Sequence, residues 1–369
     1  MDIADSSDEV SIETILTSNG GWSNQQTTLE NRFTEHLTDQ DLDAISLSEF
    51  ILTITQFKVQ LFSSSTLFQN SSEFSIGEGL DFDVDSCTIP GGEKVAAKRV
   101  KLATALRRSD GSIVSDLSRR VRKVLQEIRI LKHSIIERSS SIINLIGASL
   151  ESVQGDFSTP LLVLEYAEFG TLRQYLSNTP HTSIQEKQEL CLQVGRGLLT
   201  LHACNICHGD VKLDNVLVVR SAEGNAIAKI ADFGSSILIQ DTVLRYIYWG
   251  TTSYNAPELR SNENTQSGTS VSIDMLLACD VFSYGLLLYE SVHDGVEYWK
   301  VQGGHKSTLQ YALETRIHIQ SCSAQFASSE LVYFEPLRNA IEISITLDSQ
   351  PRRNIRLVLE KIAGEKTVT

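Results

Sequence analysis

The sequence predicts an α+β fold. Two runs rich in apolar residues, 216–219 and 226–231, flank the turn-forming cluster SAEGN and predict a β-hairpin. A further strand is expected over residues 93–100, directly after a Pro-Gly-Gly turn. Apolar residues recur at helical spacing within residues 121–131 and 190–201, which predicts two helices that each bury one face.

Length and composition indicate a globular chain with a sizeable core. The chain has 369 residues, 41% of them hydrophobic, a length typical of roughly two or three domains. The longest apolar windows, residues 50–62 and 275–289, contain Lys58 and Asp280 and are shorter than the about 20 apolar residues of a membrane span. We therefore expect no membrane segment.

The amino-terminal region is polar and acidic. Residues 1–45 are rich in Ser, Thr, Asn and Gln, so we expect them to be mobile or only locally helical. Residues 47–62 are apolar enough for a strand or a short helix packed beside the domain that follows. The acidic start lacks the basic and apolar regions of a signal peptide, which favours a cytosolic (cytoplasmic) or nuclear location.

Charge is unevenly distributed along the chain, whose formal net charge is −14. Residues 1–70 hold 11 acids and 2 bases, whereas residues 99–132 hold 10 bases and 3 acids. The overall acidity argues against nonspecific binding to nucleic acid. The basic segment is either a solvated helix face or a surface that meets the acidic region or a phosphorylated partner.

Six cysteines spread over the chain predict free thiols rather than a disulfide framework. Cys204 and Cys207 form a CxxC directly before His208, but no second ligand pair has a matching spacing. We therefore expect two small buried thiols there rather than a metal site.

The hairpin is predicted to bring potential metal ligands together at its open end. With the turn centred between Glu223 and Gly224, Asn215 stands opposite Asp232. Amide and carboxylate oxygens are hard ligands that suit Mg²⁺. Asp210 and Lys212 lie just upstream. Taken alone, the segment has the alternative of a polar loop followed by a solvated hairpin, which we consider second.

A glycine pair marks a possible phosphate-binding turn. Gly77 and Gly79 have a G-x-G spacing, and Val84 follows them. Small residues let backbone N–H groups approach phosphates closely, although an ordinary β-turn can have the same spacing.

A lysine and a glutamate are predicted at positions that require a partner. Lys98 lies inside the apolar strand 93–100, where it needs anions unless the strand is an edge and the side chain points to solvent. Glu127 lies at the inward edge of the apolar face of helix 121–131, where an acid needs a cation. We therefore expect Lys98 and Glu127 to pair.

Together these segments resemble the eukaryotic protein kinase family over about residues 70–362. The matching motifs, in chain order, are the G-x-G with its valine, VAAK, HGDVKLDN, DFG, the GT and APE signatures within GTTSYNAPEL, and DVFSYG. The resemblance implies a bilobal protein-kinase-like fold. A small β-rich N-lobe would span residues 46–167, and a larger, mostly helical C-lobe residues 168–369.

The resemblance also implies a reaction, namely ATP-dependent phosphoryl transfer to a protein substrate with Mg²⁺ as metal. Asp210 would orient the substrate hydroxyl, Asn215 and Asp232 would hold metal, and Lys98 with Glu127 would contact the phosphates. The residues expected at the nucleotide are Gly77, Gly79, Val84, Ala96, Lys98, the gatekeeper Leu164, Glu165 to Ala167, and Leu217.

Three further assignments follow from the resemblance. Lys212 and Thr251 favour Ser or Thr over Tyr as acceptor. Asp280 would brace the loop that carries Asp210. Glu258 would pair with an arginine of QPRRN, Arg353 rather than Arg352.

Two residues depart from the family pattern. Phe82 stands where a third glycine is usual, and Gly209 stands where most members have an arginine that binds a phosphate on the activation segment. These departures leave two alternatives open. One is a pseudokinase that serves as a scaffold, and the other is a small-molecule phosphotransferase of the aminoglycoside or choline kinase kind.

Overall fold

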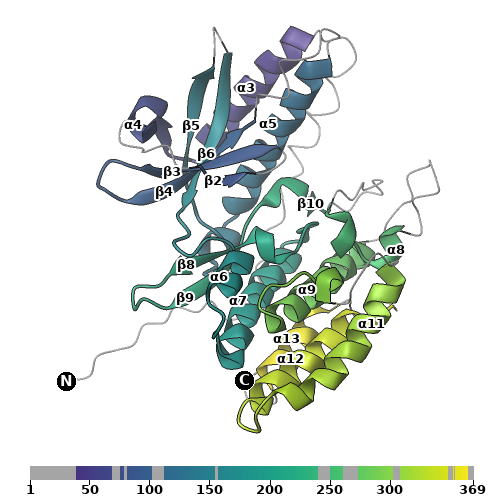
Figure 1. The fold of residues 1–369 in the computed structure, drawn as a ribbon. Coiled ribbons are helices and arrows are strands. Elements are labelled where there is room, and N and C mark those ends of the chain that lie inside the picture. Colours follow the sequence, from purple (N-terminus) through teal and green to yellow (C-terminus); the bar gives the residue numbers. More distant parts are fainter. Residues whose placement is uncertain are drawn as a thin grey trace.

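The computed structural model describes residues 39–68, 75–78, 81–101, 112–153, 157–239, 250–260, 273–301, 308–347, 352 and 354–364. Within these residues, a β-sheet region is followed along the chain by a mostly helical region (Figure 1). The predicted α+β class and the division into a β-rich and a helical part are confirmed.

A six-stranded sheet forms the first part, in the order β1-β5-β6-β4-β3-β2. The strand β1 runs parallel to β5, and the other neighbours are antiparallel. The predicted strand over residues 93–100 is β4, which lies inside the sheet, so Lys98 is not on an edge strand. The bounds are β1 (Leu61–Ser63), β2 (Ser75–Glu78), β3 (Phe82–Thr88), β4 (Lys94–Val100), β5 (Leu145–Val153) and β6 (Phe157–Glu165).

Helices α3 (Asp39–Gln56) and α5 (Ser112–Leu131) pack against each other beside this sheet (Figure 1), and the short helix α4 (Ser64–Phe68) follows β1. Phe50 and Ile54 of α3 are buried in the same apolar cluster as the inward face of α5. Residues 1–38 lie outside the described part of the chain. The helix α3 runs through the predicted boundary at residue 45, and residues 47–62 form its end and the start of β1.

The predicted hairpin is present as β8 (Val216–Arg220) and β9 (Ala226–Ile230), but its predicted register was wrong by one residue. Val216 pairs with Ile230, so Asn215 stands opposite Ala231, whose N–H donates to the Asn215 carbonyl at 2.9 Å. The reason is the loop: residues 221–225 form a five-residue connection rather than one centred between two residues. Asp232 therefore lies one position beyond Ala231, the residue that stands opposite Asn215.

The second part of the chain is built around helix α9, which is apolar on all sides and contacts α7 and α12. Its helices are α6 (Leu172–Asn178), α7 (Ile184–Ala203), α8 (Pro257–Arg260), α9 (Ile273–Val292), α10 (Tyr298–Val301), α11 (Thr308–Ser321), α12 (Leu331–Ser344) and α13 (Ile355–Ala363). The remaining short elements are η2 (Ile136–Arg138), β7 (Ile206–Cys207), η3 (Leu213–Asn215), η4 (Phe233–Ser235), β10 (Ile237–Leu238), η5 (Thr252–Tyr254) and η6 (Cys322–Gln325).

Among the described residues, α9 is the one helix long and apolar enough to cross a membrane. However, 89% of the window that passes this test is buried inside the fold, as is typical of the core helix of a globular domain.

The arginine predicted to pair with Glu258 was wrong. Arg352, not Arg353, places its Nη2 2.9 Å from both carboxylate oxygens of Glu258. The Arg352 side chain is fully buried, donates to the Ala278 carbonyl and lies over the Phe282 ring, so two contacts with α9 fix its direction. Arg353 lies outside the described residues.

Candidate active site

One buried lysine joins the sheet to the helical part. The Lys98 ammonium on β4 lies 2.7 Å from Glu127 Oε2 of α5 and 2.9 Å from Asp232 Oδ1, at the end of the hairpin. The predicted pairing of Lys98 with Glu127 is confirmed. The Lys98 and Glu127 side chains are 8% and 0% exposed, whereas that of Asp232 is 48% exposed. Asp232 therefore presents this cluster to solvent.

The opposite charges in this cluster stabilise the ionised forms of Lys98 and Asp232. Burial alone would lower the pKa of Lys98, but the carboxylates of Asp232 and Glu127 outweigh it and hold that pKa above its ordinary value. Burial would raise the pKa of Asp232, but the Lys98 ammonium dominates and holds it well below its usual range. Asp232 is therefore ionised at neutral pH, as a metal ligand must be.

A second cluster forms around Asp210. Its Oδ2 accepts from Lys212 Nζ and from Asn215 Nδ2, both at 2.8 Å, and its Oδ1 accepts from the Thr251 N–H at 2.8 Å. Lys212 Nζ also donates to Thr251 Oγ1 at 2.7 Å. Burial opposes ionisation of Asp210, but Lys212 and the Thr251 hydrogen bonds outweigh it, so the pKa of Asp210 is lowered. An anionic, oriented carboxylate results.

Asn215 is oriented for a cation. Its amide nitrogen donates to Asp210, so its amide oxygen is the atom that it can offer to a metal. Together with the Asp232 carboxylate, this oxygen is a hard donor of the kind that Mg²⁺ prefers. The side chains present therefore fit a magnesium ion.

The loop that carries Asp210 is braced from α9, as predicted. The fully buried Asp280 accepts hydrogen bonds from the backbone N–H groups of His208 at 2.7 Å and Gly209 at 2.9 Å. His202 Nε2 lies 3.0 Å from the same carboxylate. Burial disfavours the charge, but His202 and the hydrogen bonds lower the pKa of Asp280. The loop is thus held by an anion in the core.

The backbone conformation and packing at residue 209 require a glycine. Its φ is +79°, in the left-handed region, and a Cβ there would lie too close to the carbonyl oxygen of Ser235. The segment after Asp232 and the loop before Asp210 thus touch backbone to backbone at this point.

The residues expected to line the nucleotide site lie mainly on neighbouring strands. Val84 is the cross-strand partner of both Gly77 and Lys98. Ala96 pairs with Leu164. Gly79 lies outside the described residues.

The other expected nucleotide contacts connect the sheet to the hairpin. Glu165, at the end of β6, binds Lys229 Nζ of β9 through both carboxylate oxygens at 2.8 Å. Ala167 follows in the connection, and its carbonyl accepts from Gly170. Leu217 on β8 bridges to Thr171 at the start of α6. Their role toward a nucleotide stays a prediction, because these contacts are between protein groups.

The sequence analysis did not predict that Phe82 contacts Lys98. The ring of Phe82 is buried and lies under the Lys98 ammonium, 4.7 Å from its centroid. The register of β3 and β4, in which Phe82 pairs with Val100, places both side chains on the same face two residues apart. The alternation of β3 and β4 could have revealed this contact.

The sequence also did not predict a buried network that joins α6, η5 and α9. Tyr254 Oη lies 2.9 Å from both carboxylate oxygens of Glu290, and Arg173 Nη2 lies 3.0 Å from Oε2. Burial raises the pKa of Glu290 to about 7, although Arg173 opposes this shift. These residues are far apart in the chain and share no local motif, so no local pattern in the sequence predicts the network.

Comparisons with known proteins agree with this geometry. A family model described as "Protein kinase domain" matches residues 71–358. The chain is 29% identical over 238 residues to "NUAK family SNF1-like kinase 2" of Rattus norvegicus, an alignment that covers 63% of this chain and 35% of that protein. It is 31% identical over 158 residues to "Mitogen-activated protein kinase kinase kinase 7" of Homo sapiens, covering 41% of this chain and 22% of that protein.

A third relative is "Glycogen synthase kinase-3 homolog YGK3" of Saccharomyces cerevisiae, which is 32% identical over 121 residues, 33% of this chain and 29% of that protein. This chain thus spans about a third or less of the length of these three curated relatives. The family model covers most of the chain, with the Lys98 and Asp210 clusters inside it. The chain belongs to the protein kinase domain family.

Proposed function

We propose that this chain transfers the γ-phosphoryl group of ATP to a Ser or Thr hydroxyl of a protein, with Mg²⁺ bound by Asp232 and Asn215. The observation that carries the proposal is the convergence of Lys98, Glu127 and Asp232 from three separate elements onto one cluster. A buried ion pair of this kind is costly to desolvate, which favours a functional reason for it.

Each side chain has a distinct task in the proposed reaction. Lys98 neutralises phosphate charge, and Glu127 keeps its ammonium in place. Asp210 accepts a hydrogen bond from the acceptor hydroxyl and orients it, while Lys212 supplies positive charge beside the transferred group. The bound metal supplies further neutralisation of the phosphates.

The preference for Ser or Thr is supported by the contacts of Lys212. Its ammonium bridges Asp210 and Thr251, so the loop that orients the acceptor is tied to the segment that precedes α8. Membership in the protein kinase domain family favours a protein acceptor over the aminoalcohols of small-molecule phosphotransferases.

We also propose that activity does not require a phosphate on the activation segment. Gly209 offers no cation to bind such a phosphate, and its backbone is already held by Asp280. The test is turnover of phosphatase-treated protein, with mass spectrometry confirming that Thr242, Thr251, Thr252 and Ser253 carry no phosphate. Undiminished turnover is expected. Complete loss that one rephosphorylated site restores would overturn the proposal.

A second candidate is a kinase fold that binds nucleotide weakly and acts as a scaffold. The contact between Phe82 and Lys98 favours it, because the ring lies against the ammonium that would meet the phosphates. Replacing Phe82 with Gly would then increase affinity for Mg²⁺ and ATP and raise turnover. If wild type shows no transfer and Phe82→Gly does, the scaffold reading is supported.

The deciding experiment is phosphoryl transfer from radiolabelled ATP to a generic protein substrate. Asp232→Ala should abolish transfer because the metal loses its carboxylate, and Asp210→Asn should lower the rate by about 10²- to 10⁴-fold. Glu223→Gln, an exposed carboxylate at the far end of the same hairpin, is the control and should keep full activity. Equal transfer by wild type and Asp232→Ala would contradict the proposed function.

A further inference from the structure

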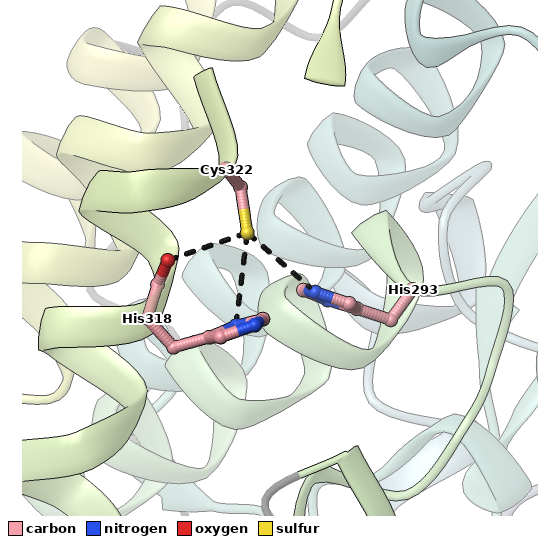
Figure 2. Close-up of side chains that lie close together, drawn as sticks. All are labelled: His293, His318 and Cys322. Carbon is pink, nitrogen blue, oxygen red and sulfur yellow. Dashed lines mark hydrogen bonds between the residues drawn. The ribbon is translucent and has the colours of Figure 1, made fainter. Parts of the chain in front are cut away.

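A cluster of two histidines and a cysteine lies in the helical part, and none of its three residues takes part in the proposed active site. His293 directly follows the end of α9, His318 lies in the last turn of α11, and Cys322 is the first residue of η6, which follows α11 directly. Their side chains converge (Figure 2). Cys322 Sγ is 3.9 Å from His293 Nε2 and 3.6 Å from His318 Nδ1.

These distances fit the ligand sphere of a zinc ion. With Zn–S about 2.3 Å and Zn–N about 2.0–2.1 Å in a tetrahedron, a sulfur and a nitrogen ligand stand roughly 3.6 Å apart. One ligand atom from each of the three residues lies within 4.8 Å of the others. Among the residues that the structure describes, this is the one group of at least three His, Cys, Asp or Glu side chains that meets this condition.

The surroundings set the chemistry of His293. Its Nδ1 lies 2.8 Å from the Tyr289 carbonyl, which can only accept, so Nδ1 carries the proton and Nε2 keeps its lone pair. Nε2 is the nitrogen that faces the Cys322 sulfur. A backbone carbonyl that fixes the tautomer in this way is the usual outer partner of a metal-bound histidine.

Tyr289 contacts the second histidine as well. Its hydroxyl lies 2.7 Å from His318 Nδ1, and its ring lies 4.3 Å from the His293 ring. A tyrosine one turn before the end of α9 thus touches both imidazoles, one through its backbone carbonyl and one through its hydroxyl. The Tyr289 carbonyl thus holds the His293 ring, and the Tyr289 hydroxyl must leave His318 Nδ1 if an ion is to bind at that nitrogen.

The spacing of the ligands along the chain explains why they meet. His318 and Cys322 are four residues apart and therefore lie on the same side of one helical turn. His293 comes from α9, so the three atoms connect two helices. An ion bound here would join the end of α9, which also carries Glu290 and its hydrogen bond to Tyr254, to α11.

We propose that His293, His318 and Cys322 form a Zn²⁺ site, with a water molecule as fourth ligand, that ties α9 to α11. Two imidazoles and one thiolate suit Zn²⁺ better than Mg²⁺ or Ca²⁺, which prefer oxygen ligands. On binding, the Cys322 thiol gives up its proton to solvent and the sulfur forms a bond to zinc, so one proton is released per ion.

The test uses the full chain after chelator treatment and titration with Co²⁺, which replaces Zn²⁺ in tetrahedral sites and reports thiolate ligation as a charge-transfer band. Wild type should show this band at one equivalent, and added Zn²⁺ should remove it. Cys322→Ser should abolish the band. His293→Gln and His318→Gln should each weaken Zn²⁺ binding by more than the roughly 10- to 100-fold cost of losing an outer-shell partner.

Cys204→Ser is the matched control. The Cys204 sulfur also lies near a histidine, 3.7 Å from His133 Nδ1, but it belongs to no group of three. This variant should keep the band and the affinity. A band lost in Cys204→Ser and kept in Cys322→Ser would overturn the proposal, as would a wild type without a band.

Thermal unfolding provides a readout that does not depend on Cys322→Ser being folded. Zn²⁺ should raise the unfolding temperature of stripped wild type and of Cys204→Ser, and should not raise that of His293→Gln. An equal increase in His293→Gln and wild type would contradict the site. Circular dichroism of the metal-free variants verifies that each one is folded.

Discussion

Glu290 is the carboxylate whose pKa is raised by burial to about 7, from 4.5. Its charge is partly compensated by Arg173 and by hydrogen bonds from Tyr254 and the Tyr298 N–H. Between these two pKa values the folded state therefore holds a proton that the unfolded chain has released. The free energy of unfolding contributed by Glu290 must then fall as pH rises through this window.

Replacing Glu290 with Gln removes this dependence. We expect wild type to lose stability relative to Glu290→Gln as pH rises from about 5 to about 8, by at most about 3 kcal/mol. The measurement is the difference in unfolding temperature across this range. Glu189→Gln, whose side chain is 53% exposed, is the control and should follow wild type. A constant difference between wild type and Glu290→Gln would contradict this prediction.

Gly209 permits a second prediction about a single residue. Gly209 and Gly224 both have positive φ, +79° and +89°, but a Cβ at 224 would meet nothing within 4 Å, whereas a Cβ at 209 would press on the Ser235 carbonyl. Gly224→Ala should therefore cost about 1–2 kcal/mol for the backbone alone. Gly209→Ala should cost more, as measured by denaturant unfolding, and should lower turnover. Equal costs would show that the backbones at 209 and 235 separate easily.

The packing of α3 against α5 supports the Lys98 cluster. Glu127 lies on α5, and the apolar face of that helix is covered by α3, from which Phe50 is fully buried. The Arg129 guanidinium of α5 also lies 3.8 Å from Glu49 of α3. The position of Glu127 therefore depends in part on a helix that begins outside the segment matched by the kinase family model.

Phe50→Ala should accordingly change both the stability of the chain and its KM for ATP. It should lower the free energy of unfolding by about 3–5 kcal/mol, because a buried aromatic ring is removed. It should also raise KM for ATP, because α5 no longer holds Glu127 firmly against Lys98. Ile51→Ala on the same helix, where the side chain is 40% exposed, should change neither. Loss of stability without any change in KM would show that α3 has no influence on nucleotide binding at the site.

The sequence predicted the elements well where their pattern was local. The strand that carries Lys98, the helix that carries Glu127 and the hairpin were all found from spacing of apolar residues. The hairpin register was missed by one residue, because register depends on how the loop over residues 221–225 closes. The choice of Arg352 over Arg353 was also missed, because it depends on which side chain faces α9. A local sequence pattern does not predict which distant elements come into contact.

The proposed site is divided between the two parts of the chain. Lys98 and Glu127 come from the sheet and its helix, whereas Asp210, Asn215 and Asp232 come from the loop and hairpin that follow α7 in the second part of the chain. The ion pair of Lys98 with Asp232 and the pair of Glu165 with Lys229 both cross this division. A ligand that contacts both sides should therefore stabilise the molecule as one unit.

We expect ATP with Mg²⁺ to raise the unfolding temperature more than ATP with a chelator does. At 100 times the dissociation constant, the added stability should be about 2.7 kcal/mol. Asp232→Asn should lose the part that depends on Mg²⁺, because an ionised oxygen ligand is removed. Asp294→Asn is a close control: Asp294 is also 48% exposed and pairs with a lysine side chain that is 8% exposed, as Asp232 does, but that lysine is Lys187. It should keep the full effect of Mg²⁺. If Asp232→Asn responds to Mg²⁺ as strongly as Asp294→Asn does, the metal is held elsewhere.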